Sequence, residues 1–147
     1  MSIFVNKVEI TEAEVGQEMQ YHPAPTQEGA WQMAAQSLVV RQLLLQQAAN
    51  SGLDIEEPEE NLIDQLLQQD VTVPEADEAT CQRFYDTHLD SFMDEESGKR
   101  LAFDQAQAHI RDYLHTKAMR MAVAEYIKAL SYSADIKGYE LSESPGT

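Results

Sequence analysis

Four histidines and one cysteine are the side chains most able to bind a metal or attack a substrate. His109 and Asp112 are three residues apart, a spacing that places two ligands on one face of a helix. His115 is six residues from His109 and belongs to a different face. A zinc site needs four protein ligands, or three and a water, so the sequence predicts no bound metal and no cofactor. His22 and His88 are interpreted as polar surface residues.

The single cysteine, Cys81, cannot form an intramolecular disulfide. An activated thiol needs a neighbouring base and an electropositive setting, whereas Asp77, Glu78 and Asp86 surround Cys81 in the sequence. Cys81 is therefore interpreted as a small apolar residue. The sequence contains neither a G-x-S-x-G motif nor a glycine-rich phosphate loop, and we expect no catalytic residue and no enzyme activity.

The chain is strongly acidic, with 26 Asp and Glu against 10 Lys and Arg and a formal charge of −16. Nucleic acids and anionic membranes would be repelled, because affinity for both depends on basic side chains. Basic or apolar protein partners remain compatible with this charge. The acidic runs lack the spacing of a calcium-binding loop and are interpreted as solvated helix starts. The N-terminal residues do not form a secretion signal and no apolar run reaches 18 residues, so we expect a cytoplasmic protein.

Methionine and aromatic residues carry the main functional indication. Flexible thioethers and amphipathic rings are typical of surfaces that adapt to several partners, although ordinary core packing is the commoner explanation for any one such residue. The candidate client-binding residues are Met19, Tyr21, Trp31, Met33, Tyr113, Met119, Met121 and Tyr126.

The elements that would position these residues begin with an alternating segment over 4–10, predicted as a short strand or hairpin arm. Thr11 and Glu14 form a capping box, with Ile10 and Val15 placed as a hydrophobic staple, and predict a helix over 12–21. The Pro-rich segment that follows breaks this helix. The next helix, over 27–50, is apolar on every side and is predicted to be buried.

Three further helices are predicted over 56–71, 77–89 and 103–132, followed by a strand over 135–141. The fold class is therefore all-α, with about five helices and a two-stranded clasp that pairs 3–9 with 136–141. Residues 1–141 are expected to form one domain, and 142–147 a flexible tail. The helix over 103–132 has a second apolar face, which favours a homodimer, with or without exchange of that helix between the two chains.

Four stretches of sequence together suggest a family: "FVNKVEITEAEVGQEMQ", "AAQSLVVRQLLLQQAANSGL", "EEPEENLIDQLLQQDVTVPEADEATCQRFYDTHLDSF" and "FDQAQAHIRDYLHTKAMRMAVAEYIKALSYSADIKGYEL". They resemble the N-terminal chaperone region and the C-terminal helix of parvulin-type peptidyl-prolyl isomerases of the SurA/NifM kind, especially those that accompany respiratory nitrate reductase. The resemblance implies a SurA-like N-terminal domain. It also implies that the catalytic parvulin domain would be inserted between Phe92 and Leu101. None of the motifs of that domain is present here.

One residue departs from the pattern of that family, which usually has glycine where this chain has Lys7. If the turn requires a positive φ at this position, Lys7 costs on the order of 1 kcal/mol. The alternative is a turn of a type that tolerates lysine.

The functional expectation is a non-catalytic chaperone that binds unfolded or partly assembled proteins through an apolar groove. A dedicated assembly or scaffold module for one partner, such as a respiratory reductase subunit, is the first alternative. The isomerase-deleted part of a peptidyl-prolyl isomerase is the second.

Overall fold

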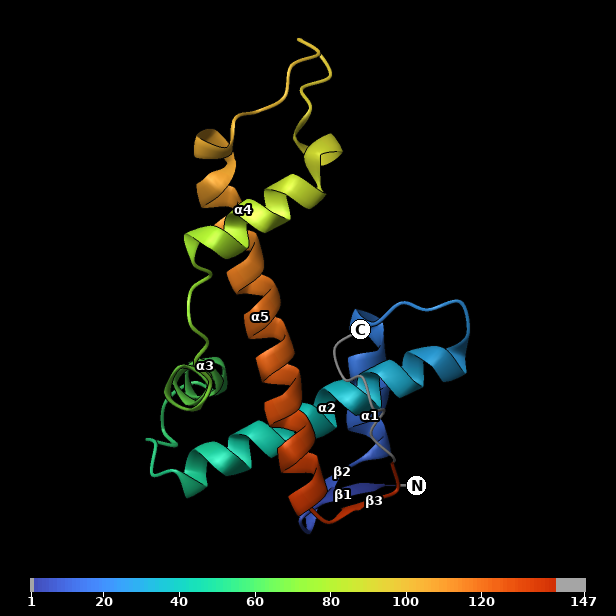
Figure 1. The fold of residues 1–147 in the computed structure, drawn as a ribbon. Coiled ribbons are helices and arrows are strands. Elements are labelled where there is room, and N and C mark those ends of the chain that lie inside the picture. The colour runs from blue at the N-terminus through green and yellow to red at the C-terminus, as the bar shows by residue number, and fades with distance from the viewer. Residues whose placement is uncertain (1, 140–147) are drawn as a thin grey trace. The chain divides into compact units, whose positions relative to one another are not determined.

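The computed structural model describes residues 2–139, which are mostly helical with a small sheet (Figure 1). This confirms the predicted all-α class with a strand clasp. The helices are α1 (Glu12–Glu18), α2 (Gln27–Asn50), α3 (Glu59–Asp70), α4 (Glu78–Thr87) and α5 (Phe103–Ser133). Two 3₁₀ turns, η1 (Met19–Tyr21) and η2 (Leu89–Phe92), follow α1 and α4. The strands are β1 (Ile3–Val5), β2 (Val8–Ile10) and β3 (Ile136–Lys137).

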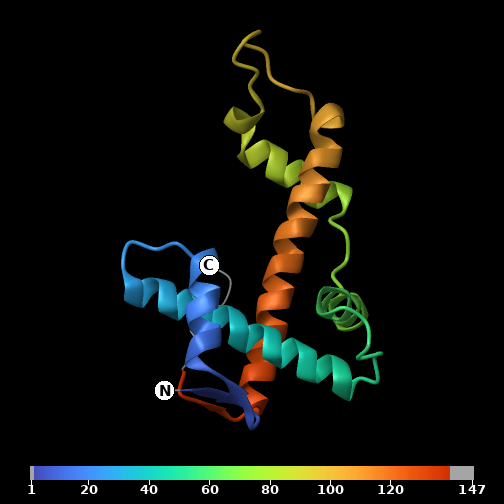
Figure 2. The same ribbon diagram turned by 180° about the vertical axis from the view of Figure 1, so that it is seen from behind.

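The sheet joins the first and last described elements of the chain (Figures 1 and 2). Its strand order is β2-β1-β3 and both pairings are antiparallel. Phe4 lies opposite Lys137 and Val5 opposite Ile136, so the predicted pairing of the two ends is confirmed. The sheet has three strands where two were expected, because residues 3–10 fold back on themselves as a hairpin. The predicted end of the last strand, residues 140–141, lies outside the described residues, as does the predicted tail.

The hairpin turns through Asn6 and Lys7, whose φ angles are 50° and 73°. Positive φ at both central residues defines the two-residue turn that matches the twist of antiparallel strands. Asn adopts this conformation more readily than other residues with a side chain. Lysine has no such preference. Of the two possibilities that the sequence left open, the structure shows the turn in which Lys7 adopts a strained, positive φ.

Asn6 also binds the turn to the far end of the chain. Its backbone N–H donates to the carbonyl of Asp135 at 2.8 Å, and the Asp135 N–H donates to Asn6 Oδ1 at 2.8 Å. Asn6 Nδ2 donates to Gln46 Oε1 at 2.9 Å, while Gln46 Nε2 donates to the Val5 carbonyl at 3.0 Å. One side chain therefore connects the hairpin, the segment after α5 and helix α2.

The helix starts follow the predicted capping signals. Thr11 Oγ1 accepts from the Glu14 N–H at 3.1 Å and the Glu14 carboxylate accepts from the Thr11 N–H at 3.2 Å, which confirms the capping box. Ile10 and Val15 are buried in one cluster, as a staple requires. The predicted start of the third helix was too early, because Pro58 is its N-cap residue and not part of its first turn.

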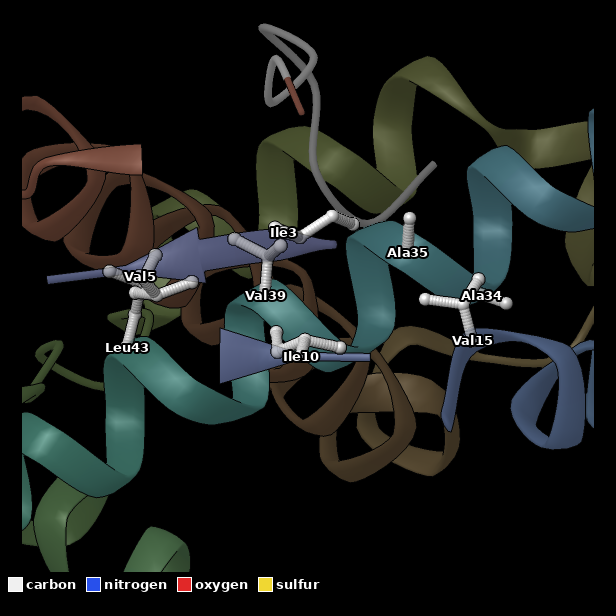
Figure 3. Close-up of a cluster of buried hydrophobic side chains, with 8 residues drawn as sticks. All are labelled: Ile3, Val5, Ile10, Val15, Ala34, Ala35, Val39 and Leu43. Atoms are coloured by element: carbon white, nitrogen blue, oxygen red, sulfur yellow. The ribbon is translucent and has the colours of Figure 1, made fainter. Parts of the chain in front are cut away.

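The chain divides into two compact units, residues Met1–Val71 with Val123–Thr147, and residues Thr72–Ala122. We refer to them as the first and second units. Helix α5 contributes residues to both. In the first unit, the sheet and α1 pack against α2 through eight buried residues (Figure 3). These are Ile3, Val5, Ile10, Val15, Ala34, Ala35, Val39 and Leu43.

Helix α2 is buried on more than one side, as its all-round apolar sequence predicted. Val39 and Leu43 belong to the eight residues just named, which we call the sheet cluster, while Leu44 and Ala48 belong to another cluster with Leu62, Leu66 and Ile127 from α3 and α5. Burying an aliphatic side chain contributes about 1.5–3 kcal/mol relative to leaving it exposed. Helix α2 is therefore the common element of both clusters in the first unit.

The second unit has a smaller core of Cys81, Ala106 and Ile110, surrounded by aromatic rings. Cys81 is completely buried, which confirms its interpretation as a small apolar residue. The loop between η2 and α5 is closed by an isolated bridge between Met93 and Arg100. Tyr85 adds a hydrogen bond from its hydroxyl to the Leu101 carbonyl at 2.6 Å.

The strained turn gives a direct prediction. Lys7→Gly should raise the free energy of unfolding by about 0.5–1 kcal/mol, because glycine adopts φ near 73° without a Cβ clash. Urea denaturation measures this change. Lys7→Ala is the matched control, since it removes the charge and keeps the Cβ. An equal gain from alanine would contradict the backbone explanation.

Candidate functional site: the surface around Trp31

Two shallow hollows flank Trp31 in the first unit. One has a volume of about 500 Å³ and the other about 510 Å³, and they share Trp31 and Gln32. We call their combined lining the Trp31 surface; it consists of Met19, Gln27, Glu28, Trp31, Gln32, Gly138 and Tyr139.

Three local structures bring these residues together. Thr26 caps α2 by accepting a hydrogen bond from the Gly29 N–H at 3.0 Å, which fixes the first turn of α2 and therefore Glu28 and Trp31. Met19 begins the 3₁₀ turn after α1, and α1 lies beside the N-terminal half of α2 in both views (Figures 1 and 2). Tyr139 follows β3, so its position depends on the pairing of β3 with β1.

The apolar groups of this surface are only half-buried. Met19, Trp31 and Tyr139 pack against the sheet cluster, and part of each side chain stays accessible. The rings of Trp31 and Tyr139 lie 6.2 Å apart at an interplanar angle of 56°, a tilted geometry typical of favourable aromatic pairs. Burial raises the pKa of the Tyr139 hydroxyl.

The rim of the surface is polar. Gln27, Glu28 and Gln32 are exposed, and their amide and carboxylate groups can bond to the backbone or the polar side chains of a ligand. Pockets of this size bind ligands mainly through apolar contact, with a few polar groups that set orientation. This arrangement suits the binding of an apolar side chain and the polypeptide that carries it.

Gly138 is essential to this geometry. Its φ is +83°, and a Cβ at this position would lie 2.6 Å from the backbone oxygen of Ser2 and 3.3 Å from Ile3 Cα. The segment leading to Tyr139 therefore passes too close to the start of β1 for any residue except glycine.

The structure brings two of the eight predicted client-binding residues together, Met19 and Trp31. Tyr21 and Met33 also belong to the first unit and are exposed, at 69% and 47%, but line neither hollow. Tyr139 was not predicted as a site residue. Its "KGY" context gave a weak signal, a glycine directly before an aromatic residue at the end of a strand.

The side chain of Tyr126 is held by contacts within the protein. Its hydroxyl donates to Asp70 Oδ2 at 2.6 Å and its ring packs in the cluster shared by α2 and α3. Burial, and secondarily the Asp70 carboxylate, raise the pKa of the Tyr126 hydroxyl well above its usual value. Within the first unit, this residue ties α5 to the end of α3.

The remaining three predicted residues lie in the second unit, on α5. Tyr113 is 52% exposed and its ring packs against Phe84, with centroids 5.4 Å apart. Met121 is 63% exposed and Met119 is half-buried. These exposed groups are compatible with the predicted homodimer through α5, which stays a prediction.

His22 and His88 make local contacts. His22 Nε2 lies 2.8 Å from the Glu18 carboxylate, and the His88 ring stacks on Phe84 at a centroid distance of 4.1 Å. Within residues 2–139, no three His, Cys, Asp or Glu side chains converge in a way that could hold a metal ion. In the same part of the chain, none of the helices combines the length and hydropathy needed to cross a membrane.

A third hollow lies on the solvent face of the sheet, with a volume of about 310 Å³. It is lined by Phe4, Lys7, Asp135 and Lys137. Lys137 Nζ is 3.8 Å from Asp135 Oδ2, and both side chains are largely exposed, so this ion pair contributes little stability. We call this the Phe4 hollow.

Comparison with known proteins identifies no relative: no protein-family model, no curated protein and no solved structure matches this chain.

The close approach at Gly138 predicts that Gly138→Ala lowers the free energy of unfolding by about 2–4 kcal/mol, because alanine adds both the clash with Ser2 and the strain of a positive φ. Urea denaturation measures the loss. Gly16→Ala is the matched control, since Gly16 lies within α1 and its Cβ would meet nothing within 4 Å. That substitution should be neutral or stabilising by up to about 1 kcal/mol. Equal behaviour of the two variants would contradict the described path of residues 138–139.

Proposed function

We propose that this chain is a non-catalytic, chaperone-like module that binds apolar segments of unfolded or partly assembled proteins at the Trp31 surface. The observation that carries the proposal is the half-buried Trp31, which lies between two hollows and pairs with Tyr139. A large ring with one side in the core is held at low entropic cost, and its other side remains available to a ligand.

Two further features support the proposal. The hollows combine apolar contact with exposed glutamine amides, which can bond to the peptide backbone whatever the sequence of the client. The formal charge of −16 also keeps the protein, and a complex with an apolar client, soluble. The resemblance found in the sequence points to the same class of function.

Refolding of an aggregation-prone client with a proline-limited slow phase tests the proposal. We expect the chain to raise the final soluble yield and to leave the rate of the slow phase unchanged, because it binds the client without catalysing isomerisation. Light scattering and a spectroscopic probe of the client provide the two readouts. An accelerated slow phase at catalytic amounts would instead favour an isomerase.

Variants connect the effect to the Trp31 surface. Trp31→Ala should remove at least about half of the gain in yield, because it deletes the ring shared by both hollows. Tyr132→Ala is the matched control; Tyr132 is an aromatic residue of the first unit that is 74% exposed and lines neither hollow. Circular dichroism verifies that each variant remains folded. An unchanged yield with folded Trp31→Ala would refute the assigned site, and no gain in yield from the wild-type chain would refute the function.

A further inference from the structure

The acidic side chains are distributed unevenly between the two units. The first unit, residues 1–71 and 123–147, contains 16 of the 26 acidic residues and only four of the ten basic ones, a formal charge of −12. The second unit contains the other ten acidic and six basic residues, a formal charge of −4. The Trp31 surface therefore belongs to the more negative unit.

None of the four basic residues of the first unit lines the Trp31 surface. Lys7 and Lys137 line the Phe4 hollow. Arg41 Nε is 2.7 Å from a carboxylate of α3, and Lys128 Nζ lies 5.9 Å from the centre of a tyrosine ring on α5. Among residues 2–139, none of those that line the Trp31 surface carries a cation.

Carboxylates do lie at or beside this surface. Glu28 lines one hollow and is exposed. Glu18 directly precedes Met19, and its carboxylate oxygen Oε2 lies 2.8 Å from His22 Nε2 and 3.5 Å from Ser37 Oγ. Glu18 is thus held in place by two contacts. These charges favour a positively charged ligand and disfavour a negatively charged one.

The two rings add a second attraction for a cation. Tryptophan has the strongest ring quadrupole of the aromatic side chains, and a Lys or Arg cation within about 6 Å of its centroid is stabilised. Trp31 and Tyr139 are half-buried and pack against each other, with ring centroids 6.2 Å apart, so a cation stacked on the accessible side of Trp31 would be partly shielded from water. Arginine suits this position best, since its planar group stacks on a ring and donates to a carboxylate at the same time.

We infer that the Trp31 surface selects segments that are both apolar and basic, with an apolar side chain in one hollow and an Arg or Lys cation on the Trp31 ring, beside Glu28 in the hollow that these two residues share. This inference rests on the proposed function, because it specifies the segment bound at the same site. It adds a selectivity that apolar binding alone would not have.

Trp31 is the only tryptophan of the chain, so its fluorescence reports directly on occupancy of this surface. The test titrates the full chain with three tryptophan-free peptides that share their Leu and Ala positions and carry Arg, Gln or Glu at the other positions. At about 50 mM salt the Arg peptide should bind about tenfold more tightly than the Gln peptide, and the Glu peptide more weakly than both. At about 0.5 M salt, where charges are screened, the Arg advantage should fall to about twofold.

A pair of variants localises the selectivity. Glu28→Gln should reduce the Arg advantage by about two- to threefold, because the affinity for the Arg peptide falls more than the affinity for the Gln peptide. Glu57→Gln removes an exposed carboxylate of the same unit that lines neither hollow, and it should leave both affinities unchanged. If the two variants reduce the Arg advantage equally, the selectivity comes from the overall charge of the unit and not from this surface.

The outcomes separate this inference from the proposed function. If all three peptides bind with equal affinity, or the Glu peptide binds best, the charge selectivity is wrong while apolar binding stands. If no peptide changes the Trp31 emission, both the selectivity and the proposed binding at this surface are wrong.

Discussion

The pairing of β1 with β3 is the interaction on which the first unit depends. It joins residues more than a hundred positions apart, Phe4 with Lys137 and Val5 with Ile136. Such a short pairing is weak by itself, and Asn6 reinforces it with hydrogen bonds to the backbone of Asp135 and to Gln46 of α2. Because β1 and β3 are paired, Gly138 passes close to the backbone of Ser2, and the ring of Tyr139 packs against that of Trp31.

The sheet can pack closely on α2 because the helix presents small residues to it. Ala34 and Ala35 are fully buried in the sheet cluster, together with Ile3 and Val5 from β1. A tightly packed interior of this kind fixes the position of the elements around it. Trp31 lies one turn before these alanines on the same helix, so the stable core also supports the ring that we assign to binding.

Local sequence signals predicted most of the fold. Helix periodicity, the Thr11–Glu14 capping box and the apolar run of α2 each depend on residues close in sequence, and the structure contains all three. The hairpin was less apparent, because its turn contains Asn6-Lys7 and not the Asn-Gly pair typical of such turns. The observed helix boundaries differ from the predicted ones by a few residues. The differences occur where a proline or a 3₁₀ turn is found in place of regular α-helix.

The candidate site was predictable only in part, since it is assembled by tertiary contacts. Met19 and Trp31 were identified by residue type, and they meet because α1 packs on α2. Tyr139 was missed because its place depends on the pairing of β3 with β1. Tyr126 was grouped with the binding residues by type, yet its hydroxyl is bound to Asp70. Residue type alone cannot distinguish a ring that is available to a ligand from one whose hydroxyl already has a partner within the protein.

The central claim is that closure of the chain ends builds the binding surface, and the peptide affinity of Asn6→Ala tests it most directly. This variant removes the side-chain contacts to Asp135 and Gln46 and lies outside the Trp31 surface. Titration of the Trp31 emission with the Arg peptide, at a temperature where circular dichroism shows intact helices, should give an affinity at least about fivefold lower than that of the wild type. Wild-type affinity in a variant whose strand pairing has been loosened, as measured by amide hydrogen exchange, would contradict the account.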